Sequence, residues 1–422
     1  MRMETEMTYE ARCGLVLAAA KALFVNGQST EQTSAGAKRV AERLGLQATL
    51  LPRWGQLALQ VENDDSPILR AVIADPTGVD MARVASLTRV IDDFAAGRLA
   101  PDRAGVAFSV ISKASPTPTW LFSLAAAAGA AALGVIFGAH HLAAVALIAA
   151  CAGAGALLRR GLAGLSGNTF LQPFSAALLA GVVGALAVRF DLSSSLRLVA
   201  VCPCMILAPG PHFLNGGLDL IRGRIHLGAA RIVFASLVVV AICAGLLFGL
   251  QLFGIALPVD PPGLDVSLWQ DVVAAGVAVA AYSIFFSTPL KMLPWPVAIG
   301  MLAHALRWMT IAGFGFGPVG GALVACLTVG LVLTPVADRL RMPFAAIGFA
   351  SVVSMIPGVF LFRMASGFLL ILTRPTASPA LLIGTVCDGA TAVKIVLAMC
   401  LGLLMPKLVI DSLIERAARK PA

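Results

Sequence analysis

The sequence predicts an all-α polytopic membrane domain of about ten transmembrane helices, arranged as two inverted five-helix repeats, behind a small α/β cytoplasmic domain. Three observations lead to this fold class. The 422 residues are 59% hydrophobic and 13% charged, whereas soluble chains are about 45–50% apolar and about 25% charged. Beyond Trp120, long apolar runs alternate with short polar joints. Two Pro-Gly breaks fall at matching places in these runs, at residues 209–210 and 357–358.

Three regions follow from this distribution: a cytoplasmic α/β domain over residues 1–115, a first five-helix membrane repeat over 116–260 and a second over 261–422. The charge content of the first region is that of a soluble domain. It ends at Ser115-Pro116-Thr117-Pro118, where two prolines prevent a helix from continuing. Residues 1–12 are polar and do not resemble a signal peptide, so we expect this domain to stay in the cytoplasm.

The first region alternates helical and extended patterns. Apolar residues recur at helical spacing from Tyr9 to Leu23, and Asn26-Gly27 then ends the helix. Ser29 and Gln32 have the spacing of a capping box for a second helix. Asp80 is placed to cap a third. We expect helices over 9–25, 29–44, 80–96 and 101–113, and strands over 46–51, 56–61 and 69–74.

Ten apolar segments follow the first region. Most approach the roughly 20 residues that a helix needs to cross about 30 Å of hydrocarbon. The fourth and the ninth are short, and each ends at one of the Pro-Gly breaks. The expected spans are 119–138, 141–158, 169–188, 195–209, 227–253, 271–288, 294–312, 317–336, 342–357 and 380–405.

The basic residues predict that both termini are cytoplasmic. Joints rich in Lys and Arg lie on one side of the predicted spans, whereas the joint 259–265 on the other side has no basic residue. Arg363 and Arg374 are exceptions. Because cytoplasmic loops carry the excess of positive charge, we expect a multi-pass protein of a bacterial inner (cytoplasmic) membrane. The same loops explain the net charge of +9 without a nucleic acid as partner.

A constant offset relates the two halves of the apolar region. Pro209 and Pro357 lie 148 residues apart (357 − 209), and this offset also superimposes the two patterns of spans. Five spans per half is an odd number, so the second half must be inverted relative to the first. Inverted repeats are typical of secondary transporters. Identical residues pair at this offset: Phe137 with Phe285, Arg159 with Arg307, and Val188 with Val336.

The two Pro-Gly pairs have two interpretations. A broken helix leaves unpaired backbone groups, which are tolerated only inside protein or beside a watery cavity. Both breaks would then line a path for a solute. Alternatively, both pairs are ordinary turns at the membrane surface. The short preceding spans favour broken helices, because neither is long enough to cross alone.

Polar residues after the breaks are the candidates for solute and proton binding. Asn215 and Asp219 would share one face of a helix, although Asp219 could instead be a solvated loop residue. Arg363 is either a partner for a carboxylate or an interfacial arginine that reaches the lipid headgroups. Asp388 and Lys394 lie inside the last span, where charge is costly and points to function. The proton-coupling candidates are Asp219, Asp388 and Lys394.

Other classes of function lack the residues they need. Cys202 and Cys204 form the only close cysteine pair, and no second pair or histidine cluster completes a metal site. The first region has no histidine and one cysteine, Cys13, so no hydrolase site can be assembled there. We expect no enzyme activity, cofactor or metal, while a sensor or assembly role for this region stays open. The isolated histidines are expected to be packed or solvated.

Several motifs of the first region resemble the threonine/serine exporter family. Asn26-Gly27-Gln28-Ser29-Thr30, followed by Arg39-Val40-Ala41-Glu42-Arg43-Leu44-Gly45-Leu46, is similar to the opening helices of that family. The segment Gly78-Val79-Asp80-Met81-Ala82-Arg83-Val84 is similar to its Gly-Val-Asp helix start.

The resemblance continues through most of the chain. Pro209-Gly210 with Asn215 and Asp219 resembles the Pro-Gly loop of the family. The second half, notably residues 285–296 and Pro357-Gly358, resembles a smaller partner domain that related proteins encode on a separate chain. The resemblance therefore implies a fused form of the exporter.

The resemblance implies a secondary active exporter of threonine and serine, driven by the proton motive force as an antiporter. Some relatives with split chains are associated with C4-dicarboxylates such as succinate instead. A zwitterion site should have a cation and an anion, such as Arg363 with Asp219. A dicarboxylate site should have two cations, such as Arg363 with Lys394. Pro211-His212 departs from the usual loop and leaves the substrate open.

The expected substrate site combines both breaks with the polar residues that follow them. Its expected partners are a small-molecule substrate and membrane lipid, and homo-oligomerisation is left open. The substrate-binding candidates are Pro209, Gly210, Asn215, Asp219, Pro357, Gly358 and Arg363.

Overall fold

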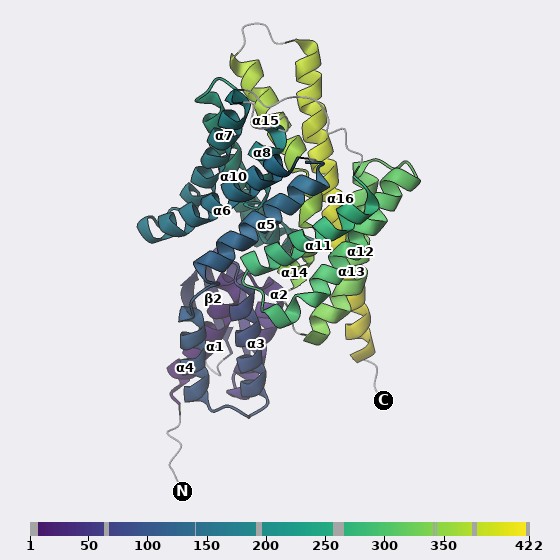
Figure 1. The fold of residues 1–422 in the computed structure, drawn as a ribbon. Coiled ribbons are helices and arrows are strands. Elements are labelled where there is room, and N and C mark those ends of the chain that lie inside the picture. The colour runs from purple at the N-terminus through teal and green to yellow at the C-terminus, as the bar shows by residue number, and fades with distance from the viewer. Residues whose placement is uncertain are drawn as a thin grey trace.

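The computed structural model describes residues 7–62, 67–139, 141–190, 196–255, 266–340, 342, 344–373 and 378–418. The predicted joint 259–265 and Arg374 lie outside these residues. One hydrophobic core joins the N-terminal elements, and a second joins the apolar helices that follow. Figure 1 shows the N-terminal region at one end of the molecule, below the long helices.

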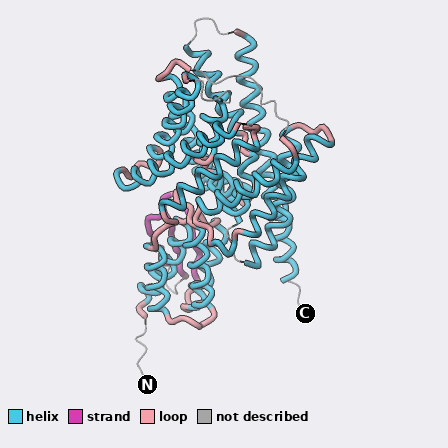
Figure 2. Tube along the Cα trace, viewed as in Figure 1, coloured by secondary structure: helices cyan, strands magenta, loops and turns pink. Residues whose placement is uncertain are grey.

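The N-terminal region contains the four helices and three strands that the sequence predicts, in the predicted order, so these predictions are confirmed. They are α1 (Tyr9–Val25), α2 (Thr30–Arg43), β1 (Ala48–Arg53), β2 (Gly55–Val61), β3 (Ile68–Ala74), α3 (Met81–Ala95) and α4 (Pro101–Lys113). The strands form an antiparallel sheet in the order β1-β2-β3, with Leu50 opposite Leu59. The sheet (magenta in Figure 2) lies beside the helices, and Leu57 and Leu59 bury their side chains in the shared core.

Side-chain caps fix where α2 and α3 begin. Ser29 Oγ accepts the backbone N–H of Gln32 at 3.4 Å, and Asp80 Oδ1 accepts that of Arg83 at 3.0 Å. The expected capping box is only half formed, because the Ser29 N–H donates to Gln28 Oε1 at 2.9 Å. Both helix starts face the membrane helices, so the caps also position the contacts between the two parts.

The remaining described helices are apolar. Seven of them are long and apolar enough to cross a membrane, or up to nine if each of two bent pairs is one span. The predicted span 294–312 falls short, because its α-helix has 15 residues and continues as a π-helix over Met309–Gly313. Ten spans therefore stays a prediction. The helices are α5 (Thr119–Ile136), α6 (Leu142–Leu165), α7 (Leu171–Arg189), α8 (Leu196–Met205), α9 (Gly210–Ile221), α10 (Ile225–Gln251), α11 (Leu268–Phe285), α12 (Pro294–Trp308), α13 (Pro318–Leu340), α14 (Phe344–Val352), α15 (Gly358–Thr373) and α16 (Pro379–Ala418).

Both Pro-Gly pairs mark sharp bends between two helices. The axes of α8 and α9 differ by 53°, and α14, extended by the 3₁₀-helix η3 (Val353–Met355), meets α15 at 66°. Proline lacks a backbone N–H and its ring blocks the preceding turn of a helix. We expected each short span to end at its Pro-Gly pair. Each short helix does end before its pair, and a second helix begins at the glycine, which fits the broken-helix interpretation. The segment that resembles the Pro-Gly loop of the family continues after Pro209 as the helix α9.

Glycines bring two pairs of helices into backbone contact. Between α7 and α10, a Cβ atom on Gly181, Gly245 or Gly249 would lie 2.2–2.4 Å from a carbonyl oxygen of the facing helix. Between α13 and α16, a Cβ on Gly330 would lie 2.6 Å from the carbonyl oxygen of Gly402. Lipid supplies no hydrophobic force between helices, so this close packing holds them together.

Replacing Gly245 by alanine should therefore push α7 and α10 apart. We expect Gly245→Ala to lower the free energy of unfolding by about 1–3 kcal/mol, the usual cost of overpacking. The matched control is Gly164→Ala in α6, where a Cβ would meet nothing within 4 Å. Thermal unfolding in detergent measures both variants. Equal melting temperatures for the two would contradict the packing described.

Candidate functional site

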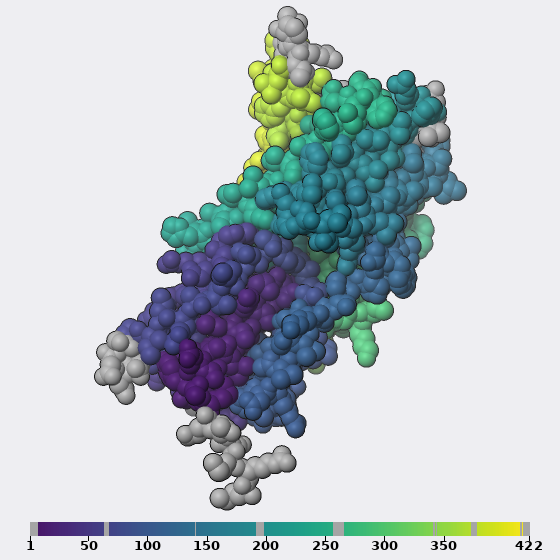
Figure 3. Space-filling model, turned by 90° about the vertical axis from the view of Figure 1, so that its left-hand side faces the viewer, coloured from purple at the N-terminus to yellow at the C-terminus, as the bar shows by residue number. Residues whose placement is uncertain are grey.

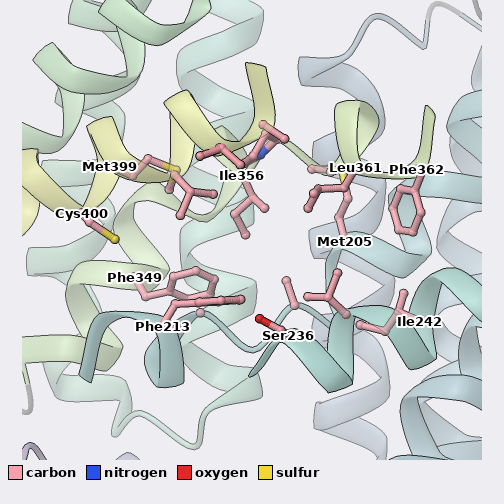
Figure 4. Close-up of a pocket in the computed structure, with 18 of the residues that line it drawn as sticks. Met205, Phe213, Ser236, Ile242, Phe349, Ile356, Leu361, Phe362, Met399 and Cys400 are labelled. Atoms are coloured by element: carbon pink, nitrogen blue, oxygen red, sulfur yellow. The ribbon is translucent and has the colours of Figure 1, made fainter. Parts of the chain in front are cut away.

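An apolar cavity of about 420 Å³ lies between the two Pro-Gly breaks. Three expected site residues line it, Gly210 from the first break and Pro357 and Gly358 from the second. Figure 4 shows the labelled side chains of this lining around an open space. Among the described lining residues only Ser236 carries a hydroxyl, and none carries a charge. This cavity alone therefore cannot compensate the charges of a polar solute.

The glycine of each break is seated against a side chain from the other bent pair. A Cβ atom on Gly210 would lie 1.6 Å from the Phe349 ring of α14, and one on Gly358 would lie 2.9 Å from Met205 of α8. The two bent pairs thus cross at their breaks. Any larger residue at Gly210 would have to displace an aromatic ring in the middle of the bundle.

A second, polar cavity of about 470 Å³ lies between the N-terminal region and the membrane helices. The turn Thr77–Asp80 before α3 forms its N-terminal side, and the end of α6 provides Arg159 and Arg160. Pro209, another expected site residue, also lines it. Ala208 lines both cavities, so the first break is the wall between them.

Arg159 places its guanidinium group in this polar cavity. Its Nε and Nη1 atoms are shielded from solvent and have no hydrogen-bond partner in the described structure. The guanidinium stacks over the rings of Phe285 (5.2 Å) and Phe122 (6.0 Å). Arg160, by contrast, donates to the carbonyl oxygen of Thr117 at 3.0 Å. A buried guanidinium with free donors is suited to a carboxylate, which it can bind with two parallel hydrogen bonds.

Asp80 supplies a carboxylate to the same cavity. Its side chain is 11% exposed, and besides capping α3 it lies 3.6 Å from Arg83 Nε. Sequence reasoning used Arg159 only for the repeat and for orientation, and Asp80 only as a helix cap. The sequence did contain a signal, because Arg159 and Arg160 follow directly after an apolar run. We attributed this pair of arginines only to the orientation of the helices in the membrane.

Asn215 and Asp219 contact the N-terminal region and do not line the apolar cavity. Asp219 is 2% exposed and accepts a hydrogen bond from Thr30 Oγ1 at 2.9 Å. Its carboxylate also lies 3.2 Å from Nε of the fully buried Arg231 and 3.4 Å from Arg224. Asn215 donates to the carbonyl oxygen of Gly27 at 3.1 Å. The idea that Asp219 is a solvated loop residue is therefore wrong.

Further contacts tie the N-terminal region to both halves of the membrane part. The Met81 N–H donates to the carbonyl oxygen of Phe286 at 2.9 Å. Arg222 forms ion pairs with Glu31 of α2 and, at 3.0 Å, with Asp411 of α16. Figure 3 shows the N-terminal region (purple) seated directly against the helices of the first half (teal).

Arg363 and Asp388 form an ion pair with each other, with 3.1 Å between Nε and Oδ2. Arg363 in α15 therefore already has a carboxylate partner from α16. It lines neither the apolar nor the polar cavity. The expected combination of Arg363 with Asp219 is not formed, because Asp219 is bound by Thr30 and Arg231. Lys394 is exposed on the surface of α16, so the expected pair of cations is not brought together either.

The cysteines and histidines offer no cluster of three or more metal ligands within the described residues. Cys202 and Cys204 are both buried in the core of the apolar helices. His212, at the first break, packs edge-on against Phe234 with 5.1 Å between ring centroids, and Phe234 in turn contacts Trp54. These contacts agree with the expectation that isolated histidines are packed.

The apolar helices, the two broken helices and the cavities beside them define a multi-pass membrane protein of the transporter class. Two family models match the chain: "Putative threonine/serine exporter" over residues 14–253 and "Threonine/Serine exporter, ThrE" over residues 271–409. The chain therefore belongs to the threonine/serine exporter family, in a form that fuses both parts.

Similar proteins carry related descriptions. A "Probable threonine/serine exporter" of Mycobacterium tuberculosis (strain ATCC 25618 / H37Rv) is 25% identical over 374 residues, which are 84% of this chain and 69% of that protein. A "Threonine/serine exporter" of Corynebacterium glutamicum is 26% identical over 204 residues, 45% of this chain and 40% of that protein. No solved structure matches the chain.

Removing the Asp219 carboxylate should destabilise the protein as a whole. Asp219→Ala leaves Arg231 buried without its counter-charge, and breaking a buried pair in this way costs about 3–5 kcal/mol. We expect the double variant Asp219→Ala/Arg231→Met to recover much of the lost stability. Thermal unfolding of the single and double variants in detergent measures the coupling. A double variant no more stable than Asp219→Ala would contradict the pairing.

Proposed function

We propose that the protein exports threonine and serine from the cytoplasm, and that the polar cavity is where the amino acid first binds. The Arg159 guanidinium, whose Nε and Nη1 have no hydrogen-bond partner within the described residues, is the observation that carries this proposal. It binds the carboxylate of the amino acid, while the Asp80 carboxylate attracts the ammonium group. A volume of about 470 Å³ falls in the range of small-molecule sites, about 300–1,000 Å³. The names of the relatives support the choice of solute.

The solute then passes from the polar cavity into the apolar cavity, across the first break. Ala208 is common to both cavities, and Pro209 and Gly210 lie on either side of the step. Broken helices suit such a passage, because their ends can tilt without disturbing the rest of the bundle. Beside the arginines, the Asp80 carboxylate of the polar cavity supplies the anion that a zwitterion needs and would repel a second carboxylate, so the cavity matches an amino acid better than a C4-dicarboxylate.

Two inverted repeats, over residues 116–260 and 261–422, would give the two breaks equivalent roles on opposite faces. Corresponding helices make corresponding contacts: α5 packs on α6 as α11 packs on α12, and α7 packs on α10 as α13 packs on α16. Across the halves, α9 contacts α14 just as α15 contacts α8. This pattern supports the repeat. In this division of the chain, residues 1–115 form a separate N-terminal domain.

The protein is proposed to lie in a bacterial inner membrane with the N-terminal domain and the end of α16 in the cytoplasm. Ion pairs from Arg222 to Glu31 and Asp411 support a common side for the two ends. Figure 1 shows α16 returning to the end of the molecule where the N-terminal domain lies. Export against a gradient needs an energy source, and we assign it to the proton motive force.

Arg159 should control the affinity for the solute. Arg159→Gln removes a charged hydrogen-bonding partner of the carboxylate, so we expect the KM for threonine efflux from proteoliposomes to rise about 10- to 100-fold. The control is Arg189→Gln, at the exposed end of α7, which should transport normally. An unchanged KM in a folded Arg159→Gln protein would remove this residue from the site. Failure of the wild-type protein to move labelled threonine or serine would refute the function itself.

The proposed orientation predicts which side of the membrane two exposed residues face. Ile221, at the end of α9, is 52% exposed, and Leu372, at the far end of α15, is 83% exposed. In a protein without its native cysteines, Ile221→Cys should react with an impermeant maleimide only from the cytoplasmic side. Leu372→Cys should react only from outside. Reaction of both from one face would contradict the proposed orientation and repeat.

A further inference from the structure

A buried group of three polar side chains lies in the second half, away from the residues discussed so far. Nδ1 of His304 in α12 lies 2.9 Å from Oδ2 of Asp271 in α11. Its other ring nitrogen, Nε2, contacts the hydroxyl of Ser354 in η3. The exposed fractions of His304, Asp271 and Ser354 are 0%, 2% and 1%. Sequence reasoning treated His304 as one more isolated histidine, because its partners are 33 and 50 residues away.

The group connects the side of the bundle opposite the N-terminal domain with the second break. The Phe285 end of α11 lies at the N-terminal domain, where Met81 bonds to Phe286. Asp271 is fourteen residues earlier (285 − 271), so it lies about 21 Å further along the helix. Ser354 lies only three residues before Pro357. Pro357 and Gly358 both line the apolar cavity.

The surroundings of the group contain few other charges. The charged groups that interact with His304 are Asp271 from α11 and Arg307, one turn further along α12. Arg307 also interacts with Asp271 and with the Cys326 thiol of α13. From α14 the nearby polar group is the Ser351 hydroxyl, which bonds to Ile347 and Pro296. Asp271 is therefore the only described carboxylate that faces the imidazole.

The first half has no titratable counterpart of this group. At the offset of 148 residues, the positions of Asp271, His304 and Ser354 correspond to Ser123, Ala156 and Ile206. The helix packing is shared by both halves, so the fold itself does not require an acid and an imidazole here. A buried ionisable pair in a membrane protein is costly, and it is a functional site by default.

We propose that Asp271, His304 and Ser354 form the proton-binding site that drives export, an inference that rests on the transport function proposed above. With Asp271 ionised, Nδ1–H of His304 donates to its carboxylate and Nε2 accepts the Ser354 hydroxyl. A proton that arrives from the outer side binds Nε2, and Asp271 balances the new charge. The Ser354 oxygen must then accept from Nε2–H, and its own hydrogen turns to another acceptor. Loss of the proton to the cytoplasm restores the first arrangement.

Binding of the proton thus changes a hydrogen bond of Ser354, which lies next to the second break on the proposed transport path. Ser354 is part of the short 3₁₀-helix that leads into the second break. A change of its hydrogen bond therefore changes how α14 is held against α12 at the point where the cavity wall bends. The protonated and unprotonated states would then favour different positions of α15, which is the requirement for coupling.

The same order of Asp, His and Ser occurs in serine hydrolases. Here the serine is 1% exposed between packed helices, so an ester or peptide cannot reach it. A hydrolase would also need donors for an oxyanion beside the serine. Labelling of Ser354 by a fluorophosphonate probe would show a reactive nucleophile and would overturn the proton-site proposal.

The test separates coupling from transport. Wild type, His304→Gln and Asp271→Asn are reconstituted into proteoliposomes, with His226→Gln, an exposed histidine at the start of α10, as matched control. Counterflow of labelled threonine at equal pH on both sides needs no proton gradient. Uphill movement driven by an imposed pH gradient does. We expect both variants to keep counterflow and to lose uphill movement to the level of empty vesicles, while wild type and control retain both.

Each other outcome has a definite meaning. Uphill movement in folded His304→Gln at the wild-type rate and with the wild-type pH dependence would overturn the proposal. Loss of counterflow and uphill movement together in a folded variant would also overturn it, because the group would then serve transport itself. If wild type shows no counterflow, the proposed function fails instead. If His304→Gln does not fold, Ser354→Ala replaces it, and an unchanged pH profile of uphill movement in that variant would refute the site.

Discussion

A carboxylate buried in a protein must be matched by donors and an opposite charge, and the structure is organised around one such group. Asp219 in α9 is held by Arg231 of α10 and by Thr30 of the N-terminal domain. The interaction therefore joins the half-helix after the first break, the long helix beside it and the first turn of α2. Because a buried ion pair is costly to separate, the domain, α9 and α10 are expected to move as one unit. The polar cavity lies directly beside this unit.

The two breaks combine a need for close packing with a need for polar surroundings. Gly210 and Gly358 allow the bent pairs to cross, since a Cβ on either would collide with Phe349 or Met205. The backbone beyond each break is then shielded from lipid by the other bent pair, as irregular backbone in a membrane requires. The cavity between them is apolar, so the charges that recognise an amino acid lie one step away, at Arg159 and Asp80. Recognition and passage are in this way assigned to neighbouring parts of the path.

Two of the three charged residues singled out in the last spans, Arg363 and Asp388, pair with each other. Arg363 neutralises Asp388, which explains how both are accommodated in an apolar part of the chain. Lys394 lies on the exposed surface of α16, as Val393 and Leu397 do. These residues attracted attention in the sequence because charge in a span is rare. The triad of Asp271, His304 and Ser354 was not predicted, because Asp271 is only the first residue of its predicted span and the partners of His304 are 33 and 50 residues away in the sequence.

The N-terminal helices and strands, most of the spans, the positions of both breaks and the family could all be predicted from the sequence. These features depend on local composition, capping residues and the period of apolar positions, which are properties of neighbouring residues. The contacts between polar groups could not be predicted and become visible only in the folded chain. Asp219 bonds to Thr30, 189 residues away. Arg159 stacks on Phe122 and Phe285, and its Nε and Nη1 have no hydrogen-bond partner within the described residues. Pairing over such separations is set by the packing of whole helices, which no local pattern of residues encodes.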